Sequence, residues 1–340
     1  MKPLNYGIIS TASINDNGFI NHIRYIKDAN LLAVASRSAK ASKEYAEKRG
    51  IPRNYGCYEE LLADADVDCV YIPLPVSLHK KWSIRALKAG KNVLCEKPVA
   101  SSAEEAEEIA QAVEETGLIF AEAFHYRYHP LCAMIENLIK SGEIGRTRSV
   151  YSQFGVYLSD KKKVQFRADC AGGALLDIGC YPVSFSRWIA GCDEAEIISA
   201  DADSDAAGVD RGANAVMRFE NGVVAEISCS LEKFLPPYAL IKGDKGSIFV
   251  FMPFCPSLRV GPAIIETYLL ISRSSGRVRS LRTSKTTTYQ SQIEAFSKAV
   301  RTGVQPATDI REGVSNMRLL DAIYKKAGVD RSACVDNSGV

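Results

Sequence analysis

The sequence predicts an α/β fold, with a doubly wound parallel sheet at the N-terminus and then an α+β domain built on a large, mostly antiparallel open sheet. Over roughly the first 122 residues, short apolar segments alternate with helix-like segments, as in βαβ units. From residue 146 onward, strand-like segments follow one another, and Asn221-Gly222 is a hairpin signal between two of them. At 340 residues the chain is long enough for two cores.

The domain boundary is expected where the strand-helix alternation stops. We therefore predict one domain over residues 1–122 and a second over 123–340. The prediction allows for a C-terminal helix, about 310–328, that packs back on the first domain.

The opening strand, residues 6–10, leads into small residues and then a helix-like segment that reaches about residue 28. A tight turn at a helix N-terminus holds phosphate through its backbone N–H groups and the helix dipole. The usual G-x-G-x-x-G pattern is absent, because Ser10, Ala12 and Asn15 stand where its glycines would fall. Two interpretations stay open: a pyrophosphate cradle of small and hydroxylated residues, or an ordinary strand-to-helix turn.

The second strand, residues 31–35, ends in Ser36 and Arg37. In a dinucleotide-binding fold, an acidic residue at this strand end favours NAD, whereas an arginine accommodates the additional phosphate of NADP. The acid is absent here, so the pattern favours NADP(H) over NAD(H). The alternative is that Arg37 only caps a surface loop.

The apolar segment 93–95 is a predicted buried strand that ends in Glu96, Lys97 and Pro98. Open α/β sheets bind ligands at the carboxyl ends of their strands, so Lys97 is placed where chemistry is expected. The alternative is a surface salt bridge at a strand end. The other predicted elements of this domain are helices through residue 49 and at 58–63, 77–90 and 102–116, and strands near 55 and at 67–72 and 118–121.

The second domain begins with a dense aromatic and cationic segment, residues 124–130, that either lines a cleft or forms an amphipathic joint. Farther on, Asp177 and Tyr181 stand four apart on one predicted helix, so both point to the same helical face. Together they are a candidate polar site; the alternative is a charge that favours the helix dipole and a core tyrosine. The other predicted elements are strands 147–155, 196–202, 213–219, 223–230, 238–241, 247–251 and 264–271, helices 131–140, 290–301 and 310–327, and a frayed tail after Asp330.

Composition excludes several classes. A formal charge of +2 provides no field for nucleic acid, and the basic run at 161–163 is short enough to be a solvated loop. Ten dispersed cysteines never form a Cys-x-x-Cys pair, and the four histidines show no metal-ligand spacing, so no metal is predicted. With no signal peptide and no apolar run of membrane-spanning length, we expect a cytoplasmic protein with reduced thiols and no membrane partner.

Together these segments resemble the glucose-fructose oxidoreductase, inositol dehydrogenase and MocA (Gfo/Idh/MocA) family of NAD(P)-dependent oxidoreductases, from the opening strand to about residue 330. The resemblance rests on Glu96-Lys97-Pro98, on Pro73-Leu74-Pro75 followed by His79, on the 127–130 segment, and on the glycine-rich segment 172–181. The chain looks closest to the NADP-dependent dihydrodiol dehydrogenases, D-xylose dehydrogenases, anhydrofructose reductases and keto-sugar reductases, which also carry a serine-arginine pair after the second strand.

The resemblance implies a Rossmann domain, and a catalytic site of Lys97, Asp177 and Tyr181 in which Lys97 contacts the substrate and the nicotinamide ribose. Many members carry histidine in place of Tyr181. A methionine is common where His125 stands, so a more polar substrate pocket that includes His125 is expected. An asparagine often occupies the position of Val76. The family also implies pairing through the second sheet, as a homodimer or homotetramer, and cofactor contacts from Ser10, Thr11, Ala12, Ile14, Ser36, Arg37, Leu74, Pro75, His79, Glu96, Lys97, Arg127 and Arg167.

Reduction of a carbonyl needs a positioned cation and a proton donor, because negative charge develops on the oxygen. Our hypothesis gives the cation to Lys97, the proton to Tyr181 and a neighbouring substrate hydroxyl to Asp177; Lys97 as proton donor is the alternative. The predicted activity is NADP-dependent hydride transfer on a sugar, keto-sugar, cyclic polyol or vicinal diol. A catalytically inactive NADP-binding regulator or scaffold of the same fold is the alternative function.

Overall fold

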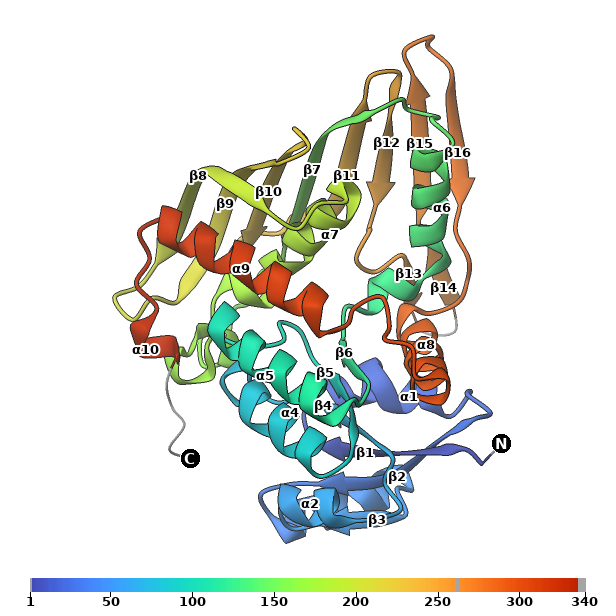
Figure 1. The fold of residues 1–340 in the computed structure, drawn as a ribbon, viewed down its shortest axis with the longest axis vertical. Coiled ribbons are helices and arrows are strands. Elements are labelled where there is room, and N and C mark those ends of the chain that lie inside the picture. Colours follow the sequence, from blue (N-terminus) through green and yellow to red (C-terminus); the bar gives the residue numbers. More distant parts are fainter. Residues whose placement is uncertain (1, 261–262, 336–340) are drawn as a thin grey trace. The chain divides into compact units, whose positions relative to one another are not determined.

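The computed structural model describes residues 2–260 and 263–335 (Figure 1). Contacts divide the chain into two compact units, the first made of Met1–Phe124 and Tyr289–Val314 and the second of His125–Thr288 and Ser315–Val340. The chain crosses between the units three times, and the third crossing falls inside a C-terminal helix, α9 (Ile310–Lys326).

The first unit contains a sheet of six described strands in the order β3-β2-β1-β4-β5-β6, and every pairing in it is parallel. The strand order reverses direction between β1 and β4, which is the switch point at which doubly wound sheets bind ligands. This confirms the predicted doubly wound fold. The strands are β1 (Leu4–Ile9), β2 (Ala29–Ala35), β3 (Arg53–Tyr55), β4 (Cys69–Ile72), β5 (Asn92–Cys95) and β6 (Phe120–Glu122).

Local sequence signals set the helix ends in this unit. The Ser38 side chain accepts a hydrogen bond from the Ala41 N–H at 3.3 Å and caps α2, which ends at the left-handed Gly50. Ser102 caps α5 in the same way, and α4 and α5 lie side by side (Figure 1). The helices are α2 (Ala39–Arg49), α3 (Tyr58–Ala63), α4 (His79–Lys88), α5 (Ala103–Thr116) and α8 (Thr288–Thr302), with a 3₁₀ turn η2 (Val76–Leu78).

The helix predicted to reach residue 28 is wrong in length and type. A π-helical turn η1 (Asp16–Ile20) is followed by the short α1 (Asn21–Ile23). Gly18 lies close to Tyr71, since a Cβ added there would come within 3.3 Å of the Tyr71 hydroxyl. Packing against the sheet, rather than helix propensity, shapes this segment.

Helix α8 belongs to the core of the first unit. Ile293 and Phe296 are fully buried in the cluster that contains Tyr6, and the Tyr6 hydroxyl lies 2.6 Å from Ser297 Oγ. Burying each of the two apolar side chains contributes about 1.5–3 kcal/mol. The sequence prediction placed the domain boundary at 122 and allowed only a helix at about 310–328 to pack back on the first domain. It did not include the contribution of α8 to the first unit.

The second unit contains a sheet of eight described strands in the order β16-β15-β12-β11-β7-β10-β9-β8. The β7–β10 pair is parallel and the other pairings are antiparallel, as predicted for a mostly antiparallel sheet. Helix α7 packs against β7 and β10 (Figure 1). The strands are β7 (Thr147–Gly155), β8 (Ala195–Ser204), β9 (Asp210–Phe219), β10 (Val224–Ser230), β11 (Leu235–Gly243), β12 (Gly246–Phe251), β15 (Tyr268–Arg273) and β16 (Val278–Arg282).

The helical elements of the second unit are of three kinds: α-helices, a π-helical turn and 3₁₀ turns. The α-helices are α6 (Pro130–Lys140), α7 (Cys180–Ala190) and α10 (Ser332–Val335), beside the C-terminal part of α9. A π-helical turn η6 (Leu175–Gly179) precedes α7, and the 3₁₀ turns are η3 (His125–Tyr128), η4 (Val164–Phe166) and η5 (Ala168–Cys170). The predicted frayed tail is thus partly helical, and its residues 336–340 lie outside the described part of the chain.

The single strand predicted over 264–271 is wrong, because two strands occupy this stretch. β14 (Ala263–Glu266) pairs with β13 (Ser257–Val260) in a small separate sheet, while β15 joins the large one. The buried Thr267 separates them, since its hydroxyl donates to the Phe251 carbonyl and its N–H donates to the Pro256 carbonyl. A continuous apolar pattern could not show this change of sheet.

Candidate functional site

The turn after β1 is held by Ser10. Its backbone adopts φ 129°, a conformation that is rare for residues with a side chain and accessible to glycine. The Ser10 hydroxyl donates to the Pro73 carbonyl at 3.1 Å and accepts from the Ala12 N–H at 3.2 Å. The buried Asn15 amide donates to the Ser10 carbonyl at 3.0 Å. The tight turn of the glycine pattern is therefore kept, because hydrogen bonds offset the strain that glycine avoids.

Arg37 follows β2 on the same edge of the sheet. Its side chain is exposed, and within residues 2–260 and 263–335 it has no hydrogen bond or ion pair. Because all strands of this sheet are parallel, the loops after β1, β2 and β4 share one edge. Six other predicted cofactor residues are half-buried in these loops: Thr11, Ala12, Ile14, Ser36, Leu74 and Pro75.

His79 links two loops of this edge. Its Nδ1 lies 2.8 Å from the Pro98 carbonyl and its Nε2 lies 2.8 Å from the Leu74 carbonyl. Only 1% of the residue is exposed, and burial lowers the pKa of His79 to about 4, so the ring is neutral near pH 7. A neutral imidazole carries one N–H, so His79 donates to one of these two carbonyls at a time. Both ring nitrogens face protein carbonyls, which favours a structural role over contact with a cofactor.

Lys97 stands in the loop that His79 fixes at Pro98. On its other side, Glu96 Oε1 accepts a 2.6 Å hydrogen bond from the buried Tyr71 hydroxyl, and Glu96 Oε2 accepts from the Lys97 N–H at 3.3 Å. Burial raises the pKa of Tyr71, which keeps the phenol protonated as the donor. The half-buried Lys97 therefore lies between two anchored neighbours at the carboxyl end of β5.

The second unit carries Asp177 and Tyr181 on consecutive turns, Asp177 in η6 and Tyr181 in the first turn of α7. The ordinary helix predicted here is instead partly π-helical, a form frequent at functional sites. The buried Asp210 fixes the start of this segment, since its Oδ2 accepts from the Leu175 N–H at 2.8 Å. Its Oδ1 accepts from the Tyr324 hydroxyl at 2.6 Å.

Tyr181 lies in a cluster of aromatic rings and is only 7% exposed. Phe154 and Phe254 flank its ring at centroid distances of 5.7 and 5.5 Å. The Tyr181 hydroxyl lies 3.4 Å from His125 Nε2, and His125 Nδ1 lies 2.8 Å from Thr288 Oγ1. Three side chains from distant parts of the sequence thus form one hydrogen-bonded chain.

Two of the three arginines predicted to contact the cofactor lie in the second unit and have partners there. The Arg127 guanidinium stacks over the Trp188 ring at 4.6 Å. Arg167 is exposed and forms an ion pair with Asp169, which raises the pKa of Arg167 and lowers the pKa of Asp169. The role of both arginines in cofactor binding stays a prediction.

Sequence reasoning missed Thr288, Asn15 and Asp210. Thr288 lies 163 positions from His125, so no local pattern relates them. Asn15 was noted only as a replacement for a glycine, although a buried amide beside a strained turn is a structural signal. Within the described residues, no group of three or more His, Cys, Asp or Glu side chains forms a metal site, and no helix is long and apolar enough to cross a membrane.

Family models match both parts of the chain. Residues 4–124 match the oxidoreductase family with an NAD-binding Rossmann fold, and residues 133–249 match the GFO/IDH/MocA C-terminal domain. The D-xylose 1-dehydrogenase (NADP(+)) 2 of Haloferax volcanii is 35% identical over 323 residues, which are 95% of this chain and 97% of that protein. The chain belongs to the Gfo/Idh/MocA family.

Other family members extend this similarity. The trans-1,2-dihydrobenzene-1,2-diol dehydrogenase of Bos taurus is 34% identical over 245 residues, 72% of each chain. The crystal structure of KijD10, a 3-ketoreductase from Actinomadura kijaniata in complex with NADP and TDP-benzene, superposes with a TM-score of 0.86 at 29% identity and covers 96% of this chain and 98% of that one. The resemblance inferred from the motifs is therefore confirmed, and the chain is an oxidoreductase by family.

Proposed function

We propose that this oxidoreductase transfers a hydride between NADP(H) and a CH–OH or C=O group of a sugar, keto-sugar, cyclic polyol or vicinal diol. The observation that carries the proposal is the anchored loop at the end of β5, where Tyr71 and His79 hold the neighbours of Lys97. The named activities of the xylose dehydrogenase, diol dehydrogenase and ketoreductase relatives support the substrate class.

The residues after β1 and β2 fit NADP(H). Arg37 is an exposed guanidinium without a hydrogen bond or ion pair in the described chain, which suits the 2′-phosphate of NADP. The turn at Ser10 presents backbone groups to a pyrophosphate at the switch point of the sheet. When bound, the nicotinamide supplies or accepts the hydride. The NADP named with the xylose dehydrogenase and KijD10 supports the same choice.

Lys97, Asp177 and Tyr181 act on the same substrate in this proposal. Lys97 stabilises the charge that develops on the substrate oxygen, Tyr181 exchanges the alcohol proton, and Asp177 binds a neighbouring hydroxyl. KijD10 has also been crystallised with one lysine replaced by alanine or glutamate and with one tyrosine replaced by phenylalanine. Those two positions are 84 apart, as are Lys97 and Tyr181 (181 minus 97), which supports the pairing.

We further propose that the enzyme works in a reducing cytoplasm as a homodimer or homotetramer. All ten cysteines lie in the described chain and are free thiols. The face of the large sheet that carries Tyr151 and Tyr238 also presents Phe249 and Tyr268, and these rings are half-buried or exposed. Tyr151 and Tyr238 stack at 5.4 Å. Such an aromatic face supports self-association, and light scattering coupled to gel filtration measures it.

The experiment is a screen of sugars, inositols, keto-sugars and diols with NADP(H) and NAD(H), followed by nicotinamide absorbance. We expect turnover with NADP(H). Tyr181→Phe should lower turnover by orders of magnitude and leave NADPH binding near normal. Unchanged turnover in Tyr181→Phe would transfer the proton role to Lys97. NADPH binding in a fluorescence titration without turnover on any substrate would instead support the inactive regulator or scaffold.

A further inference from the structure

The hydrogen-bonded chain of Tyr181, His125 and Thr288 suggests a role for His125 other than binding substrate. The imidazole is 3% exposed and Thr288 is also 3% exposed, so both groups are enclosed by protein. The ring of His125 meets the ring of Tyr181 edge to face, with centroids 6.0 Å apart. His125 therefore contacts the phenol directly and is placed to act through it.

The partners of His125 differ in kind from those of the other buried histidines. His79 faces two backbone carbonyls, which only accept hydrogen bonds. His129 accepts from the Leu131 N–H at Nδ1 and meets the Thr286 carbonyl at Nε2, which fixes its tautomer. His125 instead lies between a phenol and an aliphatic hydroxyl, and each of these both donates and accepts. Neither of these two partners therefore fixes the tautomer or the proton count of His125.

Among the described residues, the aromatic neighbours of Tyr181 other than His125 do not take its proton. Tyr126 is the other phenol beside Tyr181, with ring centroids 6.1 Å apart, and its hydroxyl lies 3.0 Å from Ser184 Oγ. Burial raises the pKa of Tyr126, which keeps it protonated. Phe154 and Phe254 complete the cluster with apolar rings. The carboxylate of the same helical segment is Asp177, four residues before Tyr181.

We propose that His125 is a positioning residue that takes the phenol proton of Tyr181, with the Thr288 hydroxyl accepting a hydrogen bond from the resulting imidazolium. The inference rests on the proposed function and deepens it. In alcohol oxidation, the Tyr181 O–H bond breaks and a proton moves to His125 Nε2. The phenolate then takes the hydroxyl proton of the substrate as the C–H electron pair leaves as hydride to NADP⁺. The products are a carbonyl, NADPH and an imidazolium that releases its proton to water after turnover.

The 3.4 Å separation between the Tyr181 oxygen and His125 Nε2 is longer than an ideal O–H···N hydrogen bond. Catalytic hydrogen bonds are often long without substrate and shorten in the complex. The shorter 2.8 Å bond to Thr288 holds the imidazole in place meanwhile.

H125Q is the decisive variant, because a glutamine still reaches the phenol with a polar group but cannot take a proton. We expect kcat for oxidation to fall about 10–100-fold and the ascending limb of the kcat–pH profile to move to higher pH, with KM and NADP⁺ affinity near wild type. T288V should lower kcat for oxidation by about 3–10-fold, whereas T288S keeps the hydroxyl and should have a kcat near wild type. The control H22Q alters a histidine that contacts Asn17 and Tyr289 and should leave the profile unchanged.

A double-mutant cycle distinguishes this role from general destabilisation. If His125 acts through Tyr181, H125Q added to Y181F should have almost no further effect on kcat. Full additivity of the two substitutions, or an unshifted pH profile in H125Q, would overturn the proposal.

A substrate-free measurement separates this inference from the proposed function. Imidazole resonances of four histidines are few enough to assign with H125Q. We expect Y181F and T288V each to shift the His125 nitrogen resonances and the titration midpoint, while T288S does not. An unchanged His125 spectrum in both variants would refute the pairing even if the enzyme is active, and a shifted spectrum in a protein without turnover would refute only the proposed function.

Discussion

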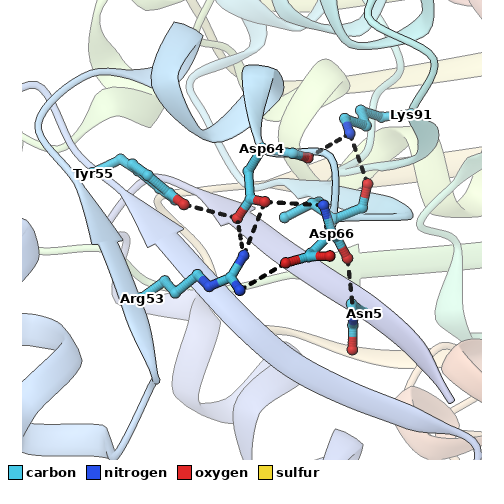
Figure 2. A network of polar contacts seen from close by, with 7 residues as sticks. Asn5, Arg53, Tyr55, Asp64, Asp66 and Lys91 are labelled. Atoms are coloured by element: carbon cyan, nitrogen blue, oxygen red, sulfur yellow. Dashed lines mark hydrogen bonds and ion pairs between the residues drawn. The ribbon is translucent and has the colours of Figure 1, made fainter.

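The two edges of the parallel sheet use polar side chains in opposite ways. At the edge where the strands begin, Arg53 donates to Asp64 and Asp66, and the Tyr55 hydroxyl donates to Asp64 (Figure 2). Figure 2 also shows the Lys91 ammonium donating to the Asp64 carbonyl oxygen. The two carboxylates neutralise the Arg53 guanidinium, and the Lys91 ammonium bonds to the backbone.

At the edge where the strands end, some polar side chains hold loops through hydrogen bonds to the backbone. Ser10 and His79 bond to backbone, while the exposed Arg37 has no hydrogen bond or ion pair in the described residues. Arg37 and Arg53 are thus the same residue type on neighbouring strands with different uses. The difference teaches that a charge without a hydrogen bond or ion pair among the described residues, beside a turn held by hydrogen bonds, is available to a ligand, whereas a charge shared by two carboxylates serves stability.

The largest expected effect concerns Lys97. K97M removes the cation but keeps a side chain of similar length, so we expect kcat/KM to fall by about 10³-fold or more because the developing charge on oxygen loses its partner. Steady-state kinetics measure this, and a thermal unfolding midpoint near wild type checks that the fold is kept. A rate within a few fold of wild type would remove Lys97 from the catalytic site.

The next effect tests the contrast between the two arginines. R37Q should weaken NADPH binding about 10–100-fold and leave NADH binding unchanged, since only NADPH carries the additional phosphate. Fluorescence titration of each cofactor gives the two affinities. R53Q is the matched control and should change neither affinity. Equal loss for both cofactors in R37Q would show that Arg37 supports the loop and not the phosphate.

A smaller effect is expected at the edge that stabilises the fold. D64N removes the shared charge from Arg53 and Tyr55, and the Asp64 side chain is only 8% exposed. We expect a loss of about 1–2 kcal/mol in the free energy of unfolding, measured with urea, and unchanged cofactor affinity. Unaltered stability together with weakened NADPH binding would reverse the assignment of the two edges.

The smallest expected effect is the loss of folding stability at acid pH that the Asp64 carboxylate causes. Burial raises the pKa of Asp64, but the hydrogen bonds from Arg53 and Tyr55 outweigh it, so the pKa lies below the ordinary 3.8. A lowered carboxyl pKa stabilises the fold above 3.8, and that contribution is lost as the pH falls through the folded pKa. Urea unfolding between pH 4 and 2 should therefore show a steeper loss in the wild type than in D64N; parallel losses would contradict this.

Local pattern was sufficient to predict candidate site residues in the first unit. The apolar strand that ends in Glu96 and Lys97 and the Ser36-Arg37 pair after β2 were read from the sequence, because a strand end is a local property. The turn at Ser10 was left open, since its strained φ and its bond to Pro73 depend on a strand 63 positions away. The lengths of α1 and of the 264–271 strand were wrong for the same reason, as packing decided both.

The sequence by itself determined the fold class and the family, and it predicted the residues that we propose for the chemistry. Alternation of strands and helices, a charged strand end and a spacing of four between Asp177 and Tyr181 are short-range signals that survive without coordinates. Only the tertiary structure decided which partners those residues meet. His125 and Thr288 come together across 163 positions, and Arg37 differs from Arg53 through neighbours that the chain brings from elsewhere. Hydrogen bonding and burial depend on how close two residues lie in space, and the number of residues between them along the chain does not determine that distance.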